Sequence, residues 1–159
     1  MIHFIGEIVL NKIAYIEDMN EWKKGFQFYQ QVKVRFSETD MFRHLNNTVP
    51  FIYFEEARIE FFKHIGLMED WLQANSETIP VVADLQCDFI KQVFFNDELK
   101  VYVKAENIGR SSVDIHYMAV KDDEDICFVG RGTIVQMSIK TGKGVPFSEE
   151  LKKKLNNIS

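Results

Sequence analysis

The chain has 159 residues, 46% of them hydrophobic and 27% charged, a composition typical of one globular domain with a sizeable core. The net charge of -5 argues against a broad nucleic-acid-binding face. No segment reaches the ~20 consecutive apolar residues of a membrane span, and residues 1–18 lack the basic and apolar regions of a signal peptide. We therefore expect a cytoplasmic protein that binds neither a membrane nor a nucleic acid.

The two cysteines, Cys87 and Cys127, each lie in an alternating apolar run. This placement favours buried, reduced thiols over a disulfide framework or a metal site. The sequence has no Cys/His cluster and no glycine-rich phosphate loop. It therefore predicts neither a metal nor a redox cofactor.

The first elements are of unequal clarity. Residues 1–25 show some helical spacing, and a short helix and an irregular arm both remain open. Residues 26–36 alternate with a period of two and predict a strand. Residues 37–47 break every period and predict a loop.

Residues 48–65 predict the clearest helix of the chain. Asn46 or Asn47 can cap it, Pro50 fits its first turn, and Gly66 can end it in a left-handed conformation. At 100° per residue its apolar side chains fill an arc of about 220°, wider than a surface helix needs. Other elements must therefore surround this helix.

The remainder of the chain supplies strands. After a short helical stretch at 68–75, four runs alternate with strand periodicity: residues 79–90, 98–107, 112–121 and 126–139. Short polar connections suit hairpins, so these strands are predicted to form an antiparallel meander with the apolar helix across its concave face. The predicted fold class is α+β, with a sheet of about five strands wrapped around one long central helix.

The predicted organisation has three parts. An N-terminal arm covers residues 1–25, the sheet-and-helix domain covers 26–147, and a short capped helix with a tail covers 148–159.

The loop and the helix after it carry a motif, and shorter matches follow in the same order along the chain. The loop supplies Thr39, Asp40, His44, Asn46 and Asn47, and the helix supplies Phe54, Glu55, Ala57 and Arg58. The later matches are Pro80–Ala83, Ile108–Ser112 and Thr141–Lys143. Over residues 30–150 the chain resembles the hot-dog-fold acyl-CoA thioesterases, the family that includes 4-hydroxybenzoyl-CoA thioesterase.

The resemblance implies a hot-dog fold and hydrolysis of an acyl-CoA thioester to free acid and CoA. It makes Asp40 the catalytic carboxylate, as general base or nucleophile, and the backbone N–H near Asn47 the donor that polarises the carbonyl. Asp40 precedes a helix N-terminus, where unpaired N–H groups can act as an oxyanion hole. The other reading is that Asp40 is only a turn or capping residue.

Three neighbours of Asp40 refine this expectation. His44 can transfer a proton or merely position the loop, and both roles stay open. Asn47 stands where some relatives with a different turn carry a catalytic histidine, which favours a route centred on Asp40. Arg43 stands where the family usually has glycine, so strain or a changed loop shape is expected there.

Glu55 and Arg58 both fall inside the apolar arc of the helix. Their i, i+3 spacing predicts a partly buried ion pair, and the alternative is that Glu55 reaches the site as a second carboxylate.

The resemblance also implies sites that bind the substrate. Arg110, Ser111 and Ser112 would meet the nucleotide of CoA, or else form a solvated hairpin tip. The resemblance implies a homodimer or homotetramer, in which the segment around Val82 from a partner chain lines the acyl pocket. CoA is part of the substrate, so no separate cofactor is expected.

Two rival functions remain at this point. One is a non-catalytic acyl-CoA-binding hot-dog module, and the other is a hot-dog acyl hydratase or dehydratase. The turn around Asp40 is unlike the turns of the hydratases and dehydratases.

Overall fold

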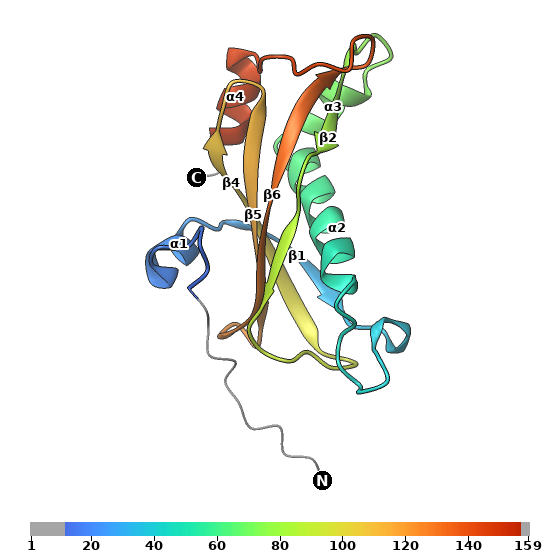
Figure 1. The fold of residues 1–159 in the computed structure, drawn as a ribbon, viewed down its shortest axis with the longest axis vertical. Coiled ribbons are helices and arrows are strands. Elements are labelled where there is room, and N and C mark those ends of the chain that lie inside the picture. Colours follow the sequence, from blue (N-terminus) through green and yellow to red (C-terminus); the bar gives the residue numbers. More distant parts are fainter. Residues whose placement is uncertain (1–11, 157–159) are drawn as a thin grey trace.

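A curved antiparallel sheet packs against a single long helix in the computed structural model, which describes residues 12–156 (Figure 1). In chain order the elements are α1 (Met19–Lys24), β1 (Phe28–Lys33), the 3-10 helix η1 (Phe36–Glu38), α2 (Val49–His64), α3 (Leu67–Leu72), β2 (Thr78–Val82), β3 (Gln86–Phe89), β4 (Glu98–Ile108), β5 (Ser112–Lys121), β6 (Asp125–Ser138) and α4 (Glu149–Asn156). The predicted α+β class is confirmed.

The sheet has the strand order β1-β4-β5-β6-β2, with β3 also paired to β6 and every pairing antiparallel. The predicted meander of four strands is wrong, because only β4, β5 and β6 follow one another. The predicted strand 79–90 is two strands, both on the far side of β6 from β5. The connection over residues 90–97 is too long for a tight hairpin, so the chain passes along the end of the sheet before β4 begins.

Two glycines of β6 allow α2 and the β2–β3 segment to lie very close to the backbone of β6. A Cβ on Gly130 would lie 2.4 Å from Cε2 of Phe54 and 2.6 Å from the carbonyl oxygen of Gln86. A Cβ on Gly132 would lie 2.8 Å from the carbonyl oxygen of Asp84. β6 therefore lacks side chains at the two places where β2 turns into β3 across it.

The helix α2 confirms the prediction for residues 48–65 to within one residue at each end. Pro50 lies in its first turn, and Gly66 follows it in the left-handed conformation with φ 73°. The predicted cap is wrong, because the N-cap residue is Thr48 and no side chain caps the helix. Asn46 forms a turn before the helix, where its Oδ1 accepts from the N–H of Thr48 at 3.0 Å.

The buried side of α2 faces β1, β4, β5 and β6. Phe54, Ala57 and Phe61 are fully buried, and the ring of Phe54 stacks on Tyr117 with 4.4 Å between centroids. The predicted Glu55–Arg58 ion pair is wrong. Arg58 is buried and donates from Nη1 to the Tyr117 hydroxyl at 3.0 Å, whereas Glu55 is exposed. The partner of Arg58 is therefore a residue of the sheet, Tyr117 of β5, and not Glu55 of the same helix.

Both ends of the described chain pack onto the sheet. Residues 148–156 confirm the predicted capped helix, in which Ser148 Oγ accepts from the N–H of Leu151 at 3.1 Å. Leu151 and Leu155 are buried in the main core. Within residues 12–156 no helix is long and apolar enough to cross a membrane.

Residues 12–26, called the strap below, lie on the outer face of the sheet, opposite α2. Its apolar side chains and those of β5 and β6 form a second cluster: Ile13, Ile16, Trp22, Phe26, Met118, Val120 and Val129. Asp18 caps α1, since its Oδ1 accepts from the N–H groups of Asn20 and Glu21 at 2.8 and 3.0 Å. The part of the helical spacing noted for residues 1–25 that falls on residues 1–11 lies outside the described residues.

The prediction of buried, unbridged thiols is confirmed for Cys127, whereas Cys87 is unbridged but less buried than predicted. Cys127 is buried and Cys87 is half-buried, and neither forms a disulfide. Burial raises the pKa of the Cys87 thiol to about 12 and that of Cys127 to about 11. Both thiols stay protonated at neutral pH.

Candidate active site

The carboxylate of Asp40 shapes the loop before α2. Its Oδ1 accepts from the N–H of Phe42 at 2.8 Å and from the N–H of His44 at 3.2 Å. The backbone closes the same turn, because the N–H of Asp40 donates to the carbonyl oxygen of His44 at 2.8 Å. Oδ2 accepts no hydrogen bond from any residue of 12–156. One oxygen thus holds the turn while the other keeps its lone pairs, so the turn role and the catalytic role are compatible.

Asp40, His44 and Asn47 line one cavity of about 250 Å³. The structure therefore brings together the three residues predicted to be catalytic. Residues from other parts of the chain complete the wall: Leu45, Phe89, Lys91, Gln92, Val93 and Phe128. The cavity combines one carboxylate with largely apolar walls, which suits an acyl group beside a reacting carbonyl.

Backbone bonds fix the loop at both ends. The N–H of Leu45 donates to the carbonyl oxygen of Val93 at 2.7 Å, and the N–H of Asn46 donates to that of Glu38 at 2.8 Å. The Glu38 carboxylate accepts from the Tyr53 hydroxyl at 2.6 Å, which ties the loop to α2. Burial and this hydrogen bond raise the pKa of Tyr53, so the phenol stays a donor.

Asn47 provides the candidate oxyanion donor. Asn46 accepts hydrogen bonds from the two amides that follow Asn47, from the N–H of Thr48 on Oδ1 and from the N–H of Val49 on its carbonyl oxygen. The N–H of Asn47 has no acceptor in the part of the chain that the structure describes. The N–H of Asn47, a residue that lines the same cavity as Asp40 and lies just before α2, is thus available to a carbonyl oxygen.

The imidazole of His44 lies against an aromatic ring and does not pair with Asp40, which contacts only the His44 backbone. Its ring centroid is 5.3 Å from that of Phe94 in an edge-on arrangement, and the two residues form a backbone bridge. No residue of the described chain hydrogen-bonds the imidazole. The ring is therefore held by packing on the wall of the cavity.

Arg43 adopts the left-handed conformation with φ 68° in which glycine carries no penalty. The expected strain is thus present, while the loop keeps its turn.

We expect Arg43→Gly to raise the free energy of unfolding by up to about 1 kcal/mol, because it removes the cost of a left-handed side chain. Urea unfolding measures this difference. The matched control is Gly66→Ala at φ 73°, which should lower stability by about 1 kcal/mol. A clear loss of stability in Arg43→Gly would contradict the assignment of strain.

The other predicted site residues lie away from this cavity. The loop is anchored beside the start of β4, whereas Arg110 and Ser111 follow its end (Figure 1). The 11 residues of β4 span roughly 35 Å at the usual rise of a strand. Arg110 is exposed, Ser111 and Ser112 are half-buried, and the exposed side chains of Glu55 and Val82 do not line the cavity.

Sequence reasoning missed the wall that faces Asp40. Phe89, Lys91 and Gln92 come from β3 and the connection after it, and Lys91 forms an ion pair with Asp125. This connection carries no motif, and it is brought to the loop by the bond from Leu45 to Val93 and by the backbone bridge between His44 and Phe94. In residues 12–156 no three His, Cys, Asp or Glu side chains are grouped to hold a metal ion.

A sheet curved around one helix, with a carboxylate loop at the N-terminus of that helix, defines the class of hot-dog thioesterases. The family described as Thioesterase-like superfamily matches residues 34–155, and the chain belongs to this family. The predicted hot-dog fold and the predicted family are both confirmed.

The chain is similar in sequence or structure to other proteins, including the following three. It is 46% identical over 143 residues to the uncharacterized protein YsmA of Bacillus subtilis, covering 89% of this chain and 95% of YsmA. It is 22% identical over 129 residues to the long-chain acyl-CoA thioesterase FadM of Escherichia coli, covering 80% of this chain and 96% of FadM. A crystal structure of a Thermus thermophilus thioesterase complexed with coenzyme A and Zn superposes with a TM-score of 0.70 at 27% identity, covering 85% and 96% of the two chains.

Proposed function

We propose that the protein is an acyl-CoA thioesterase that hydrolyses the thioester to free acid and CoA. The observation that carries the proposal is that one cavity is lined by two residues with complementary free groups. Asp40 presents a carboxylate oxygen that no described residue occupies, and Asn47 presents a backbone N–H without an acceptor. Thioester hydrolysis needs both a base or nucleophile and a donor for the developing oxyanion.

Two routes use this arrangement. In the first, Asp40 removes a proton from water, the water oxygen attacks the thioester carbon, and the tetrahedral intermediate expels the CoA thiolate. In the second, Asp40 itself attacks and forms a mixed anhydride with loss of CoA, and water then hydrolyses the anhydride. In both routes the N–H of Asn47 stabilises the negative carbonyl oxygen. His44, held against Phe94, positions the loop or relays a proton.

The comparisons support the choice of CoA. FadM is named for long-chain acyl-CoA, and the Thermus protein was crystallised with coenzyme A. The apolar side chains of Phe89, Val93 and Phe128 suit the acyl portion. The proposal uses no cofactor besides the CoA of the substrate.

We assign the distant predicted residues to a partner subunit of a homodimer or homotetramer. Since Arg110 and Ser111 lie roughly one strand length from Asp40 of their own chain, they would serve the CoA nucleotide at a partner's cavity. β2 is an edge strand with one unpaired side, and Ile79 and Val82 on it are exposed. Such an edge supports association between copies.

A panel of acyl-CoAs of different chain length and aromatic character tests the proposal through release of free thiol. We expect turnover of at least one acyl-CoA, with weaker turnover of the matched acyl-pantetheine, because that control lacks the nucleotide. Binding of acyl-CoA without thiol release would favour the binding module instead. Loss of an enoyl-CoA double bond without thiol release would favour the hydratase.

A further inference from the structure

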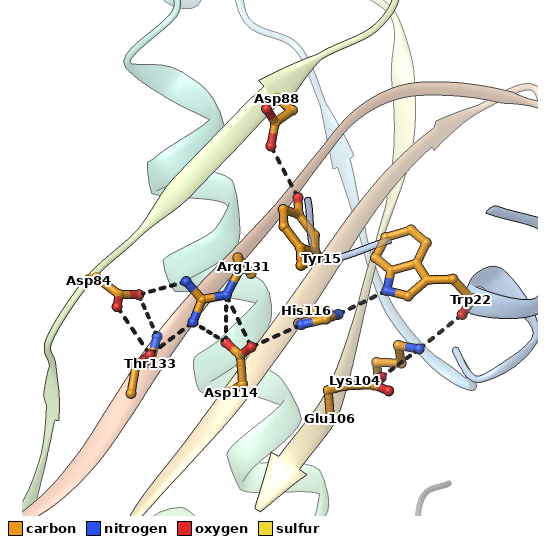
Figure 2. Close-up of polar contacts among 10 residues, drawn as sticks. All are labelled: Tyr15, Trp22, Asp84, Asp88, Lys104, Glu106, Asp114, His116, Arg131 and Thr133. Carbon is orange, nitrogen blue, oxygen red and sulfur yellow. Dashed lines mark hydrogen bonds and ion pairs between the residues drawn. The ribbon is translucent and has the colours of Figure 1, made fainter. Parts of the chain in front are cut away.

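The strap is held on the outer face of the sheet by a chain of polar contacts that includes His116 of β5 (Figure 2). Nε1–H of Trp22 donates to Nδ1 of His116 at 2.8 Å, and both side chains are buried. On the other side of the ring, Nε2 lies 3.1 Å from Oδ2 of Asp114. Tyr15 adds an edge-on ring contact to His116, with centroids 5.1 Å apart.

These contacts fix both the tautomer and the charge of His116. An indole N–H can only donate, so Nδ1 must carry a lone pair. The ring proton is then on Nε2, where it donates to Asp114, and the imidazole is neutral. A second proton on Nδ1 would place two donors against each other in a buried site. Protonation of His116 and closure of the strap therefore exclude each other.

The charges around His116 do not offset this conflict. Asp114 is already engaged by Arg131 of β6, whose Nη2 lies 2.7 Å from Oδ1. Lys104 of β4 lies beside the ring, where its Nζ contacts Glu106 at 2.8 Å and donates to the carbonyl oxygen of Trp22 at 2.9 Å. The remaining acidic groups around this face come from the strap, from β3 and from the connection before it. Glu17, Asp18 and Glu21 line the cavity that His116 also lines, Asp84 forms an ion pair with Arg131, and Asp88 accepts from the Tyr15 hydroxyl.

Burial lowers the pKa of His116, and the hydrogen bond to Asp114 offsets only part of that shift. The lowered pKa means that the closed strap has its full stability above the ordinary histidine pKa of about 6.5. That stability is lost as the pH falls from this value toward the pKa of the closed state.

We propose that the strap is a pH-controlled cover of the outer sheet face, closed while His116 is neutral and released when His116 takes a second proton. Release would uncover Met118, Val120 and Val129 on the sheet. The inference does not depend on the proposed hydrolase activity, because it concerns the opposite face of the sheet.

Linkage sets the size of the effect. When the strap is open, His116 is expected to have its ordinary pKa of about 6.5, and when the strap is closed the ring stays neutral. The ratio of open-strap to closed-strap molecules is then about thirtyfold higher at pH 5 than at pH 8. Amide hydrogen exchange reads this ratio as protection factors of the strap, with the central amides of β5 as an internal reference. We expect strap protection to fall about thirtyfold between these pH values and β5 protection to change far less.

The indole N–H signals give a second readout. The chain has two tryptophans, and Trp71 donates to the amide oxygen of Gln136, which does not titrate. Only the Trp22 signal should move with pH, and Trp22→Phe assigns it. The imidazole nitrogen shifts of the wild-type protein at pH 8 should report a neutral ring with its proton on Nε2, which tests the geometry without any variant.

His116→Gln is the matched control, because glutamine can accept from Trp22 and donate to Asp114 but cannot titrate. We expect its strap protection to be independent of pH. Equal protection of the wild-type strap at pH 5 and pH 8 would overturn the proposal. So would the same loss of protection in His116→Gln, or a proton on Nδ1 at pH 8.

Discussion

Asp40→Asn is expected to lower acyl-CoA hydrolysis at least about a hundredfold, the usual minimum contribution of a general base. Asparagine keeps an Oδ1 that can accept from the N–H groups of Phe42 and His44, so the turn should persist. It loses the negative charge and the basic oxygen on which both routes depend. Thiol release measures the effect, and unfolding by urea should change by less than about 0.5 kcal/mol.

The control for this variant is Asp122→Asn. Asp122 is exposed in the β5–β6 hairpin at φ 53°, a conformation that asparagine also accepts. Its activity should equal that of the wild type. A non-hydrolysable thioether analogue should bind Asp40→Asn with an affinity close to wild type. Hydrolysis by Asp40→Asn at the wild-type rate would remove Asp40 from the mechanism.

Gly130→Ala is expected to lower the free energy of unfolding by about 2–3 kcal/mol. The new Cβ would lie 2.4 Å from Cε2 of Phe54 and 2.6 Å from the carbonyl oxygen of Gln86, both well inside contact distance. Phe54 is fully buried and stacked on Tyr117, so its ring has no free space to enter. Urea unfolding of the purified variant measures the loss.

Two further variants locate the cause of that loss. Gly109→Ala is the control, since its nearest atoms would lie at 3.3 Å and it should cost far less. In a Phe54→Leu background, Gly130→Ala should cost less than in the wild type, because one of the two clashes is relieved while that with Gln86 stays. Equal costs in both backgrounds would place the clash on the backbone alone.

The parts of the fold that sequence predicts well are those fixed by local signals. Pro50 and Gly66 set the ends of α2, and the short polar turns around β5 set its bounds at Ser112 and Lys121. The predictions that fail depend on distant partners. A helical wheel places Glu55 beside Arg58 but does not contain Tyr117, which binds Arg58 across 59 positions of the chain.

The same division applies to the candidate site. Asp40, His44 and Asn47 lie within one loop, so one motif indicates all three. The facing wall reaches the loop through a backbone bond between Leu45 and Val93, which no periodicity reveals. The hydrogen bond that holds the strap joins Trp22 to His116, 94 positions apart, and no sequence pattern indicates it.

The strap also determines how copies of the chain can assemble. With residues 12–26 seated on β5 and β6, a second sheet can stack on this part of the outer face only by displacing them. The parts of the sheet left open to a second copy are then its edges, where β1 and β2 each have one unpaired side. A homologue without such a segment would expose the same apolar face to another copy. A segment seated on β5 and β6 can thus select between edge-to-edge and back-to-back packing of sheets with one fold.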